Sequence, residues 1–265
     1  MGILEEITNT KKKEIQTGIK EKPVSELRKS HFFNREVPSL ESALDIKGPA
    51  IITEFKRRSP SKGLINICSE LTEVTKGYQA SGASAVSVLT DMEYFGGHIR
   101  DLSATAQILE IPVLRKDFII DEYQVIEAKS AGASAILLIG SIIDKNQSRL
   151  LTKLACDLGM SVLFEIHDLK DLDVMDPSIR IIGVNNRNLN TFNIDMENSV
   201  ELLSQLPAES IKVAESGFSS PADVKKMHGY GYNAFLIGTL FMSSPDPAEK
   251  AKSFIAELKS QYINA

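Results

Sequence analysis

The chain has 265 residues, of which 43% are hydrophobic and 25% charged, and its 30 basic and 35 acidic residues give a net charge of −5. These proportions are typical of a globular protein and exclude disorder, collagen and coiled coil as descriptions of the whole chain. Basic and acidic residues are interleaved without a basic stripe, so we expect neither nucleic acid nor a membrane surface as a partner. The length suits one or two domains, or a single α/β barrel of about 250 residues.

The first residues predict a helical segment that precedes the strands. Apolar residues recur at helical spacing over residues 3–19, and Pro23 marks the end of the pattern. A second helix is expected from Ser25, a candidate N-cap, towards His31. We interpret the run Lys11–Lys13 as a solvated helix face rather than an anion site.

Eight runs rich in β-branched and aliphatic residues follow, with helical patterns between them. The spacing leaves room in each unit for a strand, a helix of about 10 to 15 residues and two loops, which is typical of a parallel sheet. Eight units without a break favour a single (β/α)₈ TIM barrel over residues 47–265, with residues 1–46 as a helical extension covering the barrel mouth. The predicted strands are Ala50–Lys56, Ala85–Thr90, Pro112–Lys116, Ala135–Ile139, Ser161–Glu165, Ile179–Val184, Ile211–Glu215 and Ala234–Ile237.

A short repeat supports the barrel. Gly82, Gly132 and Gly231 each precede small residues and then a predicted strand. We expect each glycine to end a helix in the left-handed conformation. An internal duplication and ordinary loop chemistry both explain the repeat, and either one fits a barrel.

The cysteines and the apolar segments bear on the compartment. Cys68 and Cys156 form no CxxC pair, so we expect neither a disulfide framework nor a zinc site, and we expect both to be reduced core or helix residues. The longest mainly apolar stretch, residues 133–143, is shorter than the roughly 20 residues that cross a membrane. The N-terminus lacks a signal-peptide pattern. We expect a soluble, cytoplasmic protein.

Polar residues end five of the eight predicted strands. Active sites of these barrels are built at the carboxyl ends of the strands, and residues at i and i+2 on a strand share a face. We therefore expect carboxylates and ammonium groups to meet at one mouth, where burial and opposite charge adjust their pKa values for proton transfer. The candidates are Glu54, Lys56, Lys116, Glu165, Asn185 and Glu215.

The last two strands predict a phosphate site. Ser216-Gly217 and Gly238-Thr239 follow them, and small residues there let backbone N–H groups approach an anion. The sequence contains neither GxGxxG nor GxxxxGK[ST], so a nucleotide is not expected. The four histidines show no metal-binding spacing, and we assign surface or packing roles to His31, His98, His167 and His228.

Several motifs, taken together, resemble the indole-3-glycerol-phosphate synthase family. The resemblance extends over about residues 45–250, and the first residues are similar to that family's N-terminal extension. The motifs are Glu54–Gly63, Ser87–Thr90, Tyr94–Gly97, Pro112–Phe118, Gly183–Leu189, Ala214–Gly217 and Phe235–Gly238.

The resemblance implies a reaction in tryptophan biosynthesis. In it, 1-(2-carboxyphenylamino)-1-deoxyribulose 5-phosphate closes to indole-3-glycerol phosphate with loss of CO₂ and water. The resemblance places Lys116 as general acid on the ribulose carbonyl, and Lys56 on the substrate carboxylate with a share of the acid work. Glu165 and Lys56 would serve as base and acid in the dehydration, while Glu54 and Glu215 would orient the lysines and the sugar hydroxyls.

The remaining candidates would bind substrate. Asn185 would hold it by hydrogen bonds, Arg187 would flank the anthranilate end, and Phe95 and Phe118 would be apolar walls or simply core residues. We expect no metal or cofactor, no second catalytic domain after residue 265, and a monomer, with association with other enzymes of tryptophan biosynthesis left open. The residues assigned to the phosphate are Ser59, Ser216, Gly217, Gly238 and Thr239.

Three alternatives share parts of this pattern. A phosphosugar isomerase would share the barrel and the phosphate loops but would not need two inward lysines with three glutamates. A Schiff-base aldolase would use Lys116 as a nucleophile rather than as an acid. A non-catalytic binding barrel would be expected to have lost some of the charged strand ends, and the sequence retains them all.

Overall fold

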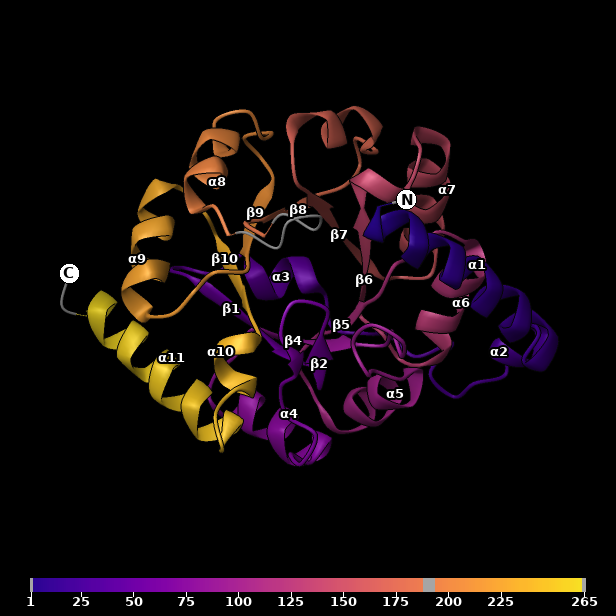
Figure 1. The fold of residues 1–265 in the computed structure, drawn as a ribbon, viewed down its shortest axis with the longest axis horizontal. Coiled ribbons are helices and arrows are strands. Elements are labelled where there is room, and N and C mark those ends of the chain that lie inside the picture. The colour runs from indigo at the N-terminus through magenta and orange to yellow at the C-terminus, as the bar shows by residue number, and fades with distance from the viewer. Residues whose placement is uncertain (1, 188–193, 264–265) are drawn as a thin grey trace.

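Eight parallel strands close into a barrel in the computed structural model, which describes residues 2–187 and 194–263 (Figure 1). Each strand pairs with its neighbours in chain order, and the last pairs with the first, so the predicted TIM barrel is confirmed. All eight predicted strands are present, with ends that differ by at most two residues. They are β1 (Ala50–Phe55), β4 (Ala85–Leu89), β5 (Val113–Lys116), β6 (Ala135–Ile139), β7 (Ser161–Ile166), β8 (Ile181–Asn185), β9 (Ile211–Glu215) and β10 (Ala234–Ile237).

Helices surround the barrel, as Figure 1 shows. The largest departure from the predicted helices of about 10 to 15 residues follows β7, where the chain forms the 3₁₀ helix η2 (Leu169–Val174). The connection between β7 and β8 is too short to hold a longer helix in addition. Gly82, Gly132 and Gly231 have φ values of 85°, 90° and 121°, so their predicted left-handed conformation is confirmed. The other helices of this layer are α4 (Leu71–Ala80), α5 (Ile99–Ile108), α6 (Glu122–Ser130), η1 (Gly140–Ile142), α7 (Lys145–Asp157), α8 (Met196–Leu203), α9 (Pro221–Tyr230), α10 (Thr239–Met242) and α11 (Pro247–Ile263).

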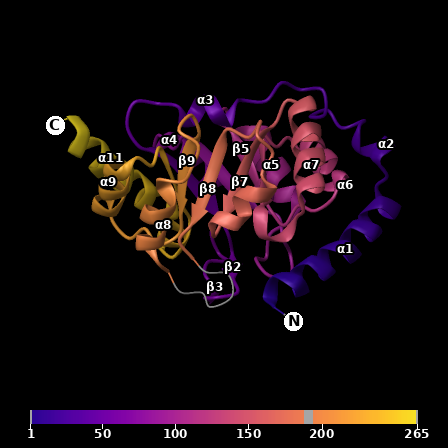
Figure 2. The ribbon, with the colours of Figure 1, turned by 90° about the horizontal axis from the view of Figure 1, so that it is seen from above.

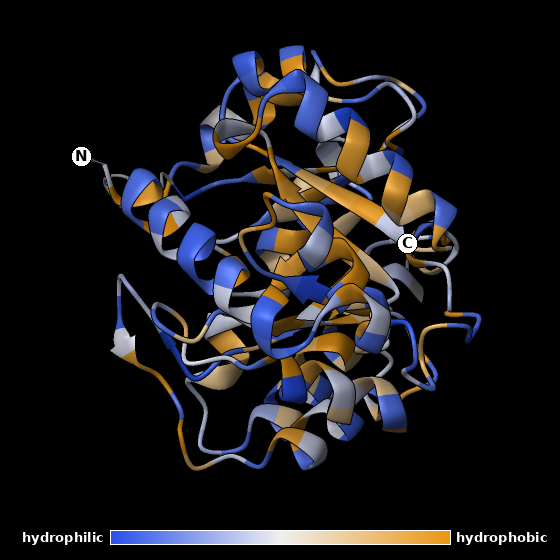
Figure 3. Cartoon of the chain, turned by 90° about the vertical axis from the view of Figure 1, so that its right-hand side faces the viewer, coloured by the Kyte–Doolittle hydropathy of each residue, from blue (hydrophilic) through white to orange (hydrophobic). Residues whose placement is uncertain are grey.

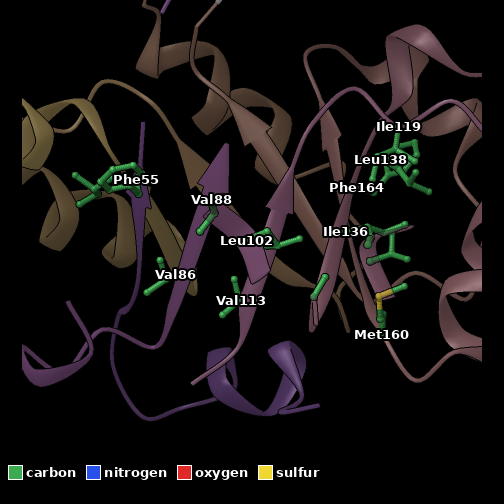
Figure 4. Close-up of a cluster of buried hydrophobic side chains, with 14 of the residues drawn as sticks. Phe55, Val86, Val88, Leu102, Val113, Ile119, Ile136, Leu138, Met160 and Phe164 are labelled. Atoms are coloured by element: carbon green, nitrogen blue, oxygen red, sulfur yellow. The ribbon is translucent and has the colours of Figure 1, made fainter. Parts of the chain in front are cut away.

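Each strand contributes to two separate cores because its side chains alternate between faces. Outward residues such as Val86, Val88 and Phe164 pack under the helices (Figure 4). Inward residues such as Ile52, Leu114 and Leu163 fill the barrel. Figure 3 shows the hydrophobic strands inside and hydrophilic outer faces on the helices. This alternation also decides which polar residues at the strand ends face the barrel axis.

The segment before β1 reaches both ends of the barrel. Figure 2 shows α3 (Leu40–Leu44) at one end, where Leu40 and Leu44 join the inner core. The start of α1 (Ile3–Glu21) and the hairpin of β2 (Arg58–Ser59) and β3 (Gly63–Leu64) lie at the other end. The helix predicted over residues 3–19 is therefore confirmed.

Two predictions for the N-terminal segment are wrong. Ser25 is not the N-cap of the second helix, because α2 (Val24–Leu27) begins after Pro23, whose extended backbone already suits a helix start. The run Lys11–Lys13 is not a wholly solvated face, because the side chain of Lys11 is only 2% exposed and ion-paired. Lys12 and Lys13 are exposed, as expected.

The cysteine prediction is correct in part. Cys68 and Cys156 are both free and exposed in the described part of the chain. Cys156 lies in α7, but Cys68 lies in neither core nor helix, because its N–H is held by the side chain of Asn66 in a loop. Among the described residues, no helix is long and apolar enough to cross a membrane.

Candidate active site

The polar strand ends meet in one cavity of about 430 Å³ at the carboxyl end of the barrel. Strand register explains the convergence, because Asn185 of β8 pairs directly with Glu215 of β9 and both point inward. All six residues predicted to converge line this cavity: Glu54, Lys56, Lys116, Glu165, Asn185 and Glu215.

Lys116 lies between two carboxylates. Its Nζ is 2.7 Å from Glu165 Oε2 and 2.6 Å from Glu215 Oε2. The Lys116 side chain is 13% exposed, while both glutamates are almost fully buried. Charged groups this deep are stable only when they are paired, so the two glutamates fix the position of the ammonium.

The environment moves the pKa values of these groups apart. Burial opposes the charge on Lys116, but the carboxylates of Glu165 and Glu215 outweigh it and raise its pKa. Burial would raise the pKa of Glu165, yet Lys116 and His167 hold that pKa well below its usual range. Burial raises the pKa of Glu215 to about 7 despite the pull of Lys116. At neutral pH the site therefore holds an ionised Glu165, a charged Lys116 and a Glu215 close to its titration midpoint.

A second lysine lies beside this group. Lys56 Nζ is 2.7 Å from Glu54 Oε1, and the Lys56 side chain is 14% exposed to the cavity. Asn185 Nδ2 donates to Glu165 Oε1 over 3.1 Å and thereby fixes the face of that carboxylate. The site thus contains two ammonium groups on different strands, each with its own acidic partner.

Gly183 in β8 and Gly238 directly after β10 leave the space that two of the carboxylates occupy. A Cβ at Gly183 would lie 2.3 Å from Glu215 Oε1, and a Cβ at Gly238 would lie 2.5 Å from Glu54 Oε1. Both distances are shorter than any tolerable contact, so a side chain at either position would displace a glutamate. Gly238 was predicted as a phosphate contact, and the structure adds this second role.

His167 contacts the site residue Glu165 without lining the cavity, and sequence reasoning missed this contact. Its Nε2 is 3.3 Å from Glu165 Oε1. Burial lowers the pKa of His167, but the effect of Glu165 is opposite and the pKa is raised overall. The predicted surface or packing role is therefore wrong for His167. Its position two residues after Glu165 was the available signal, since alternation places both on one face. His31, His98 and His228 occupy surface, capping and packing positions, as predicted.

Arg187 follows β8 and reaches across the mouth. Its backbone N–H donates to Asn185 Oδ1 over 3.0 Å, and its guanidinium donates to the Ser61 hydroxyl over 3.4 Å. Ser61 in turn lies within hydrogen-bond distance of Ser59, at 3.4 Å. The last two residues of the motif Gly183–Leu189 lie outside the described residues.

The residues predicted to hold a phosphate line one part of the same cavity: Ser59, Ser216, Gly217, Gly238 and Thr239. Ser216 and Gly217 have φ values of 69° and 90°, an unusual pair of left-handed residues. Asn186 holds this turn, because its Nδ2 donates to the Ser216 carbonyl over 2.8 Å. Strained backbone of this kind is typical of an anion-binding loop.

The opposite part of the cavity is apolar. The rings of Phe95 and Phe118 have centroids 6.2 Å apart and are tilted by 41°. Phe118 also belongs to the inner core, so it is both a core residue and part of the cavity lining. Ile3, Leu4 and Ile7 of α1 complete this wall, which the sequence did not predict.

Comparison with known proteins agrees with the resemblance found in the sequence. The family model for indole-3-glycerol phosphate synthase matches residues 4–254. The indole-3-glycerol phosphate synthase of Bacteroides thetaiotaomicron is 42% identical over 246 residues, covering 93% of this chain and 90% of the relative. That of a Polaromonas species is 40% identical over 250 residues, covering 92% and 95%.

Solved structures share the fold at low sequence identity. Tryptophan synthase subunit alpha from Legionella pneumophila matches with a TM-score of 0.63 at 10% identity, covering 85% of this chain and 98% of that one. The 3-hexulose-6-phosphate synthase of Salmonella typhimurium matches with a TM-score of 0.63 at 13% identity, covering 80% and 99%. These likenesses concern the barrel alone.

Proposed function

The chain belongs to the indole-3-glycerol phosphate synthase family, and we propose that it closes the indole ring of indole-3-glycerol phosphate from 1-(2-carboxyphenylamino)-1-deoxyribulose 5-phosphate. The observation that carries this proposal is the ammonium of Lys116, held by Glu165 and Glu215 in a cavity that joins the Ser216-Gly217 turn to an apolar wall. That cavity matches a substrate with a phosphate at one end and an aromatic acid at the other.

Ring closure needs an acid on the ketone oxygen. We assign this step to Lys116, whose proton passes to that oxygen as the ring carbon bearing the carboxylate forms the new C–C bond. The carboxylate then leaves as CO₂, and its bonding electrons restore the aromatic ring. Lys56 faces the same cavity and would hold the carboxylate until it leaves.

Dehydration needs a base, which we assign to Glu165. Its low pKa depends on the charge of Lys116, so Glu165 becomes a stronger base once Lys116 has given up its proton. Glu165 then takes a proton from the methylene carbon, while Lys56 protonates the departing hydroxyl to form water. The 2.7 Å contact returns the proton from Glu165 to Lys116, and one proton from solvent restores Lys56.

The other residues would bind and orient the substrate. Glu54 and Glu215 would hold the two lysines, Asn185 would hydrogen-bond the substrate, and Arg187 would flank the anthranilate carboxylate. Phe95 and Phe118 would form an apolar wall for the aromatic end. The phosphate would lie on backbone and hydroxyl groups of Ser59, Ser216, Gly217, Gly238 and Thr239.

We also propose that residues 1–46 act as an extension to a catalytic barrel of residues 47–265. The support is that Ile3, Leu4 and Ile7 line the cavity while every charged candidate comes from the barrel. The barrel would then supply the chemistry, and the extension would cover its apolar side.

The raised pKa of Lys116 argues against a Schiff-base mechanism, because a nucleophilic lysine must be neutral. The test combines two measurements on the wild-type chain. Indole absorbance should rise with the carboxyphenylamino substrate, and borohydride should trap no adduct at Lys116. Turnover of a keto-sugar phosphate with a borohydride-stable adduct on Lys116 would instead identify an aldolase.

A further inference from the structure

A buried lysine on α1 lies outside the group of residues used for chemistry. Lys11 Nζ is 2.6 Å from Asp91 Oδ2, 3.1 Å from Asp117 Oδ1 and 2.8 Å from Glu14 Oε2. The side chains of Lys11, Asp91 and Asp117 are 2%, 0% and 3% exposed. A cluster buried to this degree is costly unless every charge is matched, so its geometry is tightly constrained.

Each aspartate of this cluster also holds backbone of an aromatic residue in the cavity. Asp91 Oδ1 accepts from the backbone N–H of Tyr94 at 2.6 Å and of Phe95 at 3.1 Å. Asp117 Oδ1 accepts from the backbone N–H of Phe118 at 2.9 Å. Lys11 therefore bridges the two carboxylates that fix the backbone of the apolar wall, one from the β4 loop and one from the β5 loop.

The far side of Asp117 is anchored in the barrel. Its Oδ2 accepts from Arg115, at 3.2 Å, and from the Thr90 hydroxyl. Burial works against its charge, but Lys11 and Arg115 hold the pKa of Asp117 at about 2. Asp117 thus stays ionised across the neutral range, and the link to Lys11 is permanent.

The same lysine attaches α1 to the cavity. Ile7 lies four residues before Lys11 and therefore on the same helix face, where it is 3% exposed and lines the cavity. Tyr94 adds a polar contact, because its hydroxyl lies 3.3 Å from Thr10. One ammonium thereby connects the helix, the Phe95 loop and the Phe118 loop.

We propose that Lys11 is a positioning residue that sets the position of the apolar wall formed by Phe95 and Phe118 by tying Asp91 and Asp117 together. The proposal rests on the proposed function, because it takes the anthranilate ring as the group that packs on this wall. Lys11 itself touches neither ring nor substrate.

The test compares ligands with and without an aromatic ring. One probe is the substrate with its ketone reduced to an alcohol, and the other is glycerol 3-phosphate, which carries only the phosphate end. Calorimetric titration of both probes is done with the wild type, Lys11→Met, Lys11→Arg and Lys13→Met. Lys13 is the matched control, because it is an exposed lysine on the same helix.

We expect Lys11→Met to weaken binding of the ring-bearing probe by about 10-fold, the order of loss that a small misplacement of the wall causes. The affinity for glycerol 3-phosphate should be unchanged. Lys11→Arg should recover most of the affinity, and Lys13→Met should behave as the wild type. Equal weakening of both probes, or unchanged affinity for both in Lys11→Met, would overturn the proposal.

A double variant separates positioning from charge balance. Lys11→Met with Asp91→Asn removes one charge of each sign and keeps the Oδ1 that holds Phe95, so its melting temperature should approach that of the wild type. Its affinity for the ring-bearing probe should stay low. Recovery of stability and affinity together, or failure of this variant to fold, would show that Lys11 acts only through stability.

The outcome is independent of turnover. If the wild type neither converts the substrate nor binds the reduced substrate, the proposed function fails. Hydrogen exchange then tests the role of Lys11 by itself. Faster exchange at the amides of Phe95 and Phe118 in Lys11→Met, but not in Lys13→Met, would support the link. Unchanged exchange at both amides would reject it.

Discussion

Two lysines at the same end of the barrel are each held by buried carboxylates. Lys116 lies between Glu165 and Glu215, and Lys11 lies between Asp91 and Asp117. The difference is in what else the carboxylates do. Oδ1 of each aspartate also accepts backbone N–H groups, whereas Glu215 Oε1 is buried beside Gly183 and has no hydrogen-bond partner among the described residues.

This difference separates a lysine that orders structure from one that is available for chemistry. A saturated cluster holds its charge and its geometry over a wide pH range. The Lys116 cluster instead borders the cavity with a partly exposed ammonium, and shifted pKa values in a cleft are typical of functional sites. Charge and burial alone would not distinguish the two sites.

The largest expected effect is at Lys116. Lys116→Met should lower kcat by about 10²–10⁴, because positioned proton transfer is lost. Lys11→Met should retain most of its kcat at saturating substrate but lose about 3 kcal/mol of stability, because two buried aspartates lose their partner. Steady-state rates and thermal melts of both variants test this contrast, and equal losses of kcat in the two variants would contradict it.

Next in size is the base. Glu165→Gln should lower kcat by about 10². Because the acid Lys116 remains, CO₂ release should exceed indole formation in the first turnover, as a ring-closed intermediate awaits dehydration. Rapid quench with simultaneous CO₂ and indole detection measures both. Equal amounts of the two products would place the defect before dehydration and reassign Glu165.

A smaller effect is expected from crowding Glu215. Gly183→Ala would place a Cβ 2.3 Å from Glu215 Oε1. The carboxylate must therefore move, which disturbs its ion pair with Lys116. We expect kcat to fall about 10-fold, as for a misplaced catalytic group. Gly229→Ala is the control, because a Cβ there meets nothing within 4 Å. Wild-type rates in both variants would show that Glu215 tolerates displacement.

The smallest effect is a difference in the pH dependence of stability. The pKa of Asp117 is lowered from 3.8 to about 2, so its stabilising contribution is complete above pH 3.8 and is lost as the pH falls towards 2. The pKa of Glu215 is raised from 4.5 to about 7, so its ionisation costs stability as the pH rises from 4.5 through 7.

Melts across pH test these opposite signs. Glu215→Gln should gain stability relative to the wild type between pH 5 and pH 8, whereas Asp117→Asn should lose stability at pH 7 and approach the wild type near pH 2. A Glu215→Gln difference that does not change with pH would contradict the raised pKa.

Much of the charged group that lines the cavity was predictable because strand periodicity is local. Once β1 and β7 were assigned, alternation placed Glu54 and Glu165 inside the barrel. The same rule applied to His167 would have found it, but histidine spacing for metals was the wrong criterion.

The Lys11 cluster could not be predicted in this way. Its partners Asp91 and Asp117 lie far along the chain, and no local pattern reports which face of α1 docks on them. A lysine run on an amphipathic helix is usually solvated, so the local rule pointed away from burial. The apolar wall formed by Ile3, Leu4 and Ile7 escaped prediction for the same reason, since it exists only after docking.

The most direct test of the central claim is a single turnover with wild-type enzyme in excess over the carboxyphenylamino substrate. CO₂ and indole absorbance are followed together, without added metal or nucleotide. We predict one CO₂ and one indole per substrate, at a rate that collapses in Lys116→Met but not in Lys11→Met. Absence of indole with the wild type, or equal rates with and without Lys116, would contradict the assignment of Lys116 as the acid.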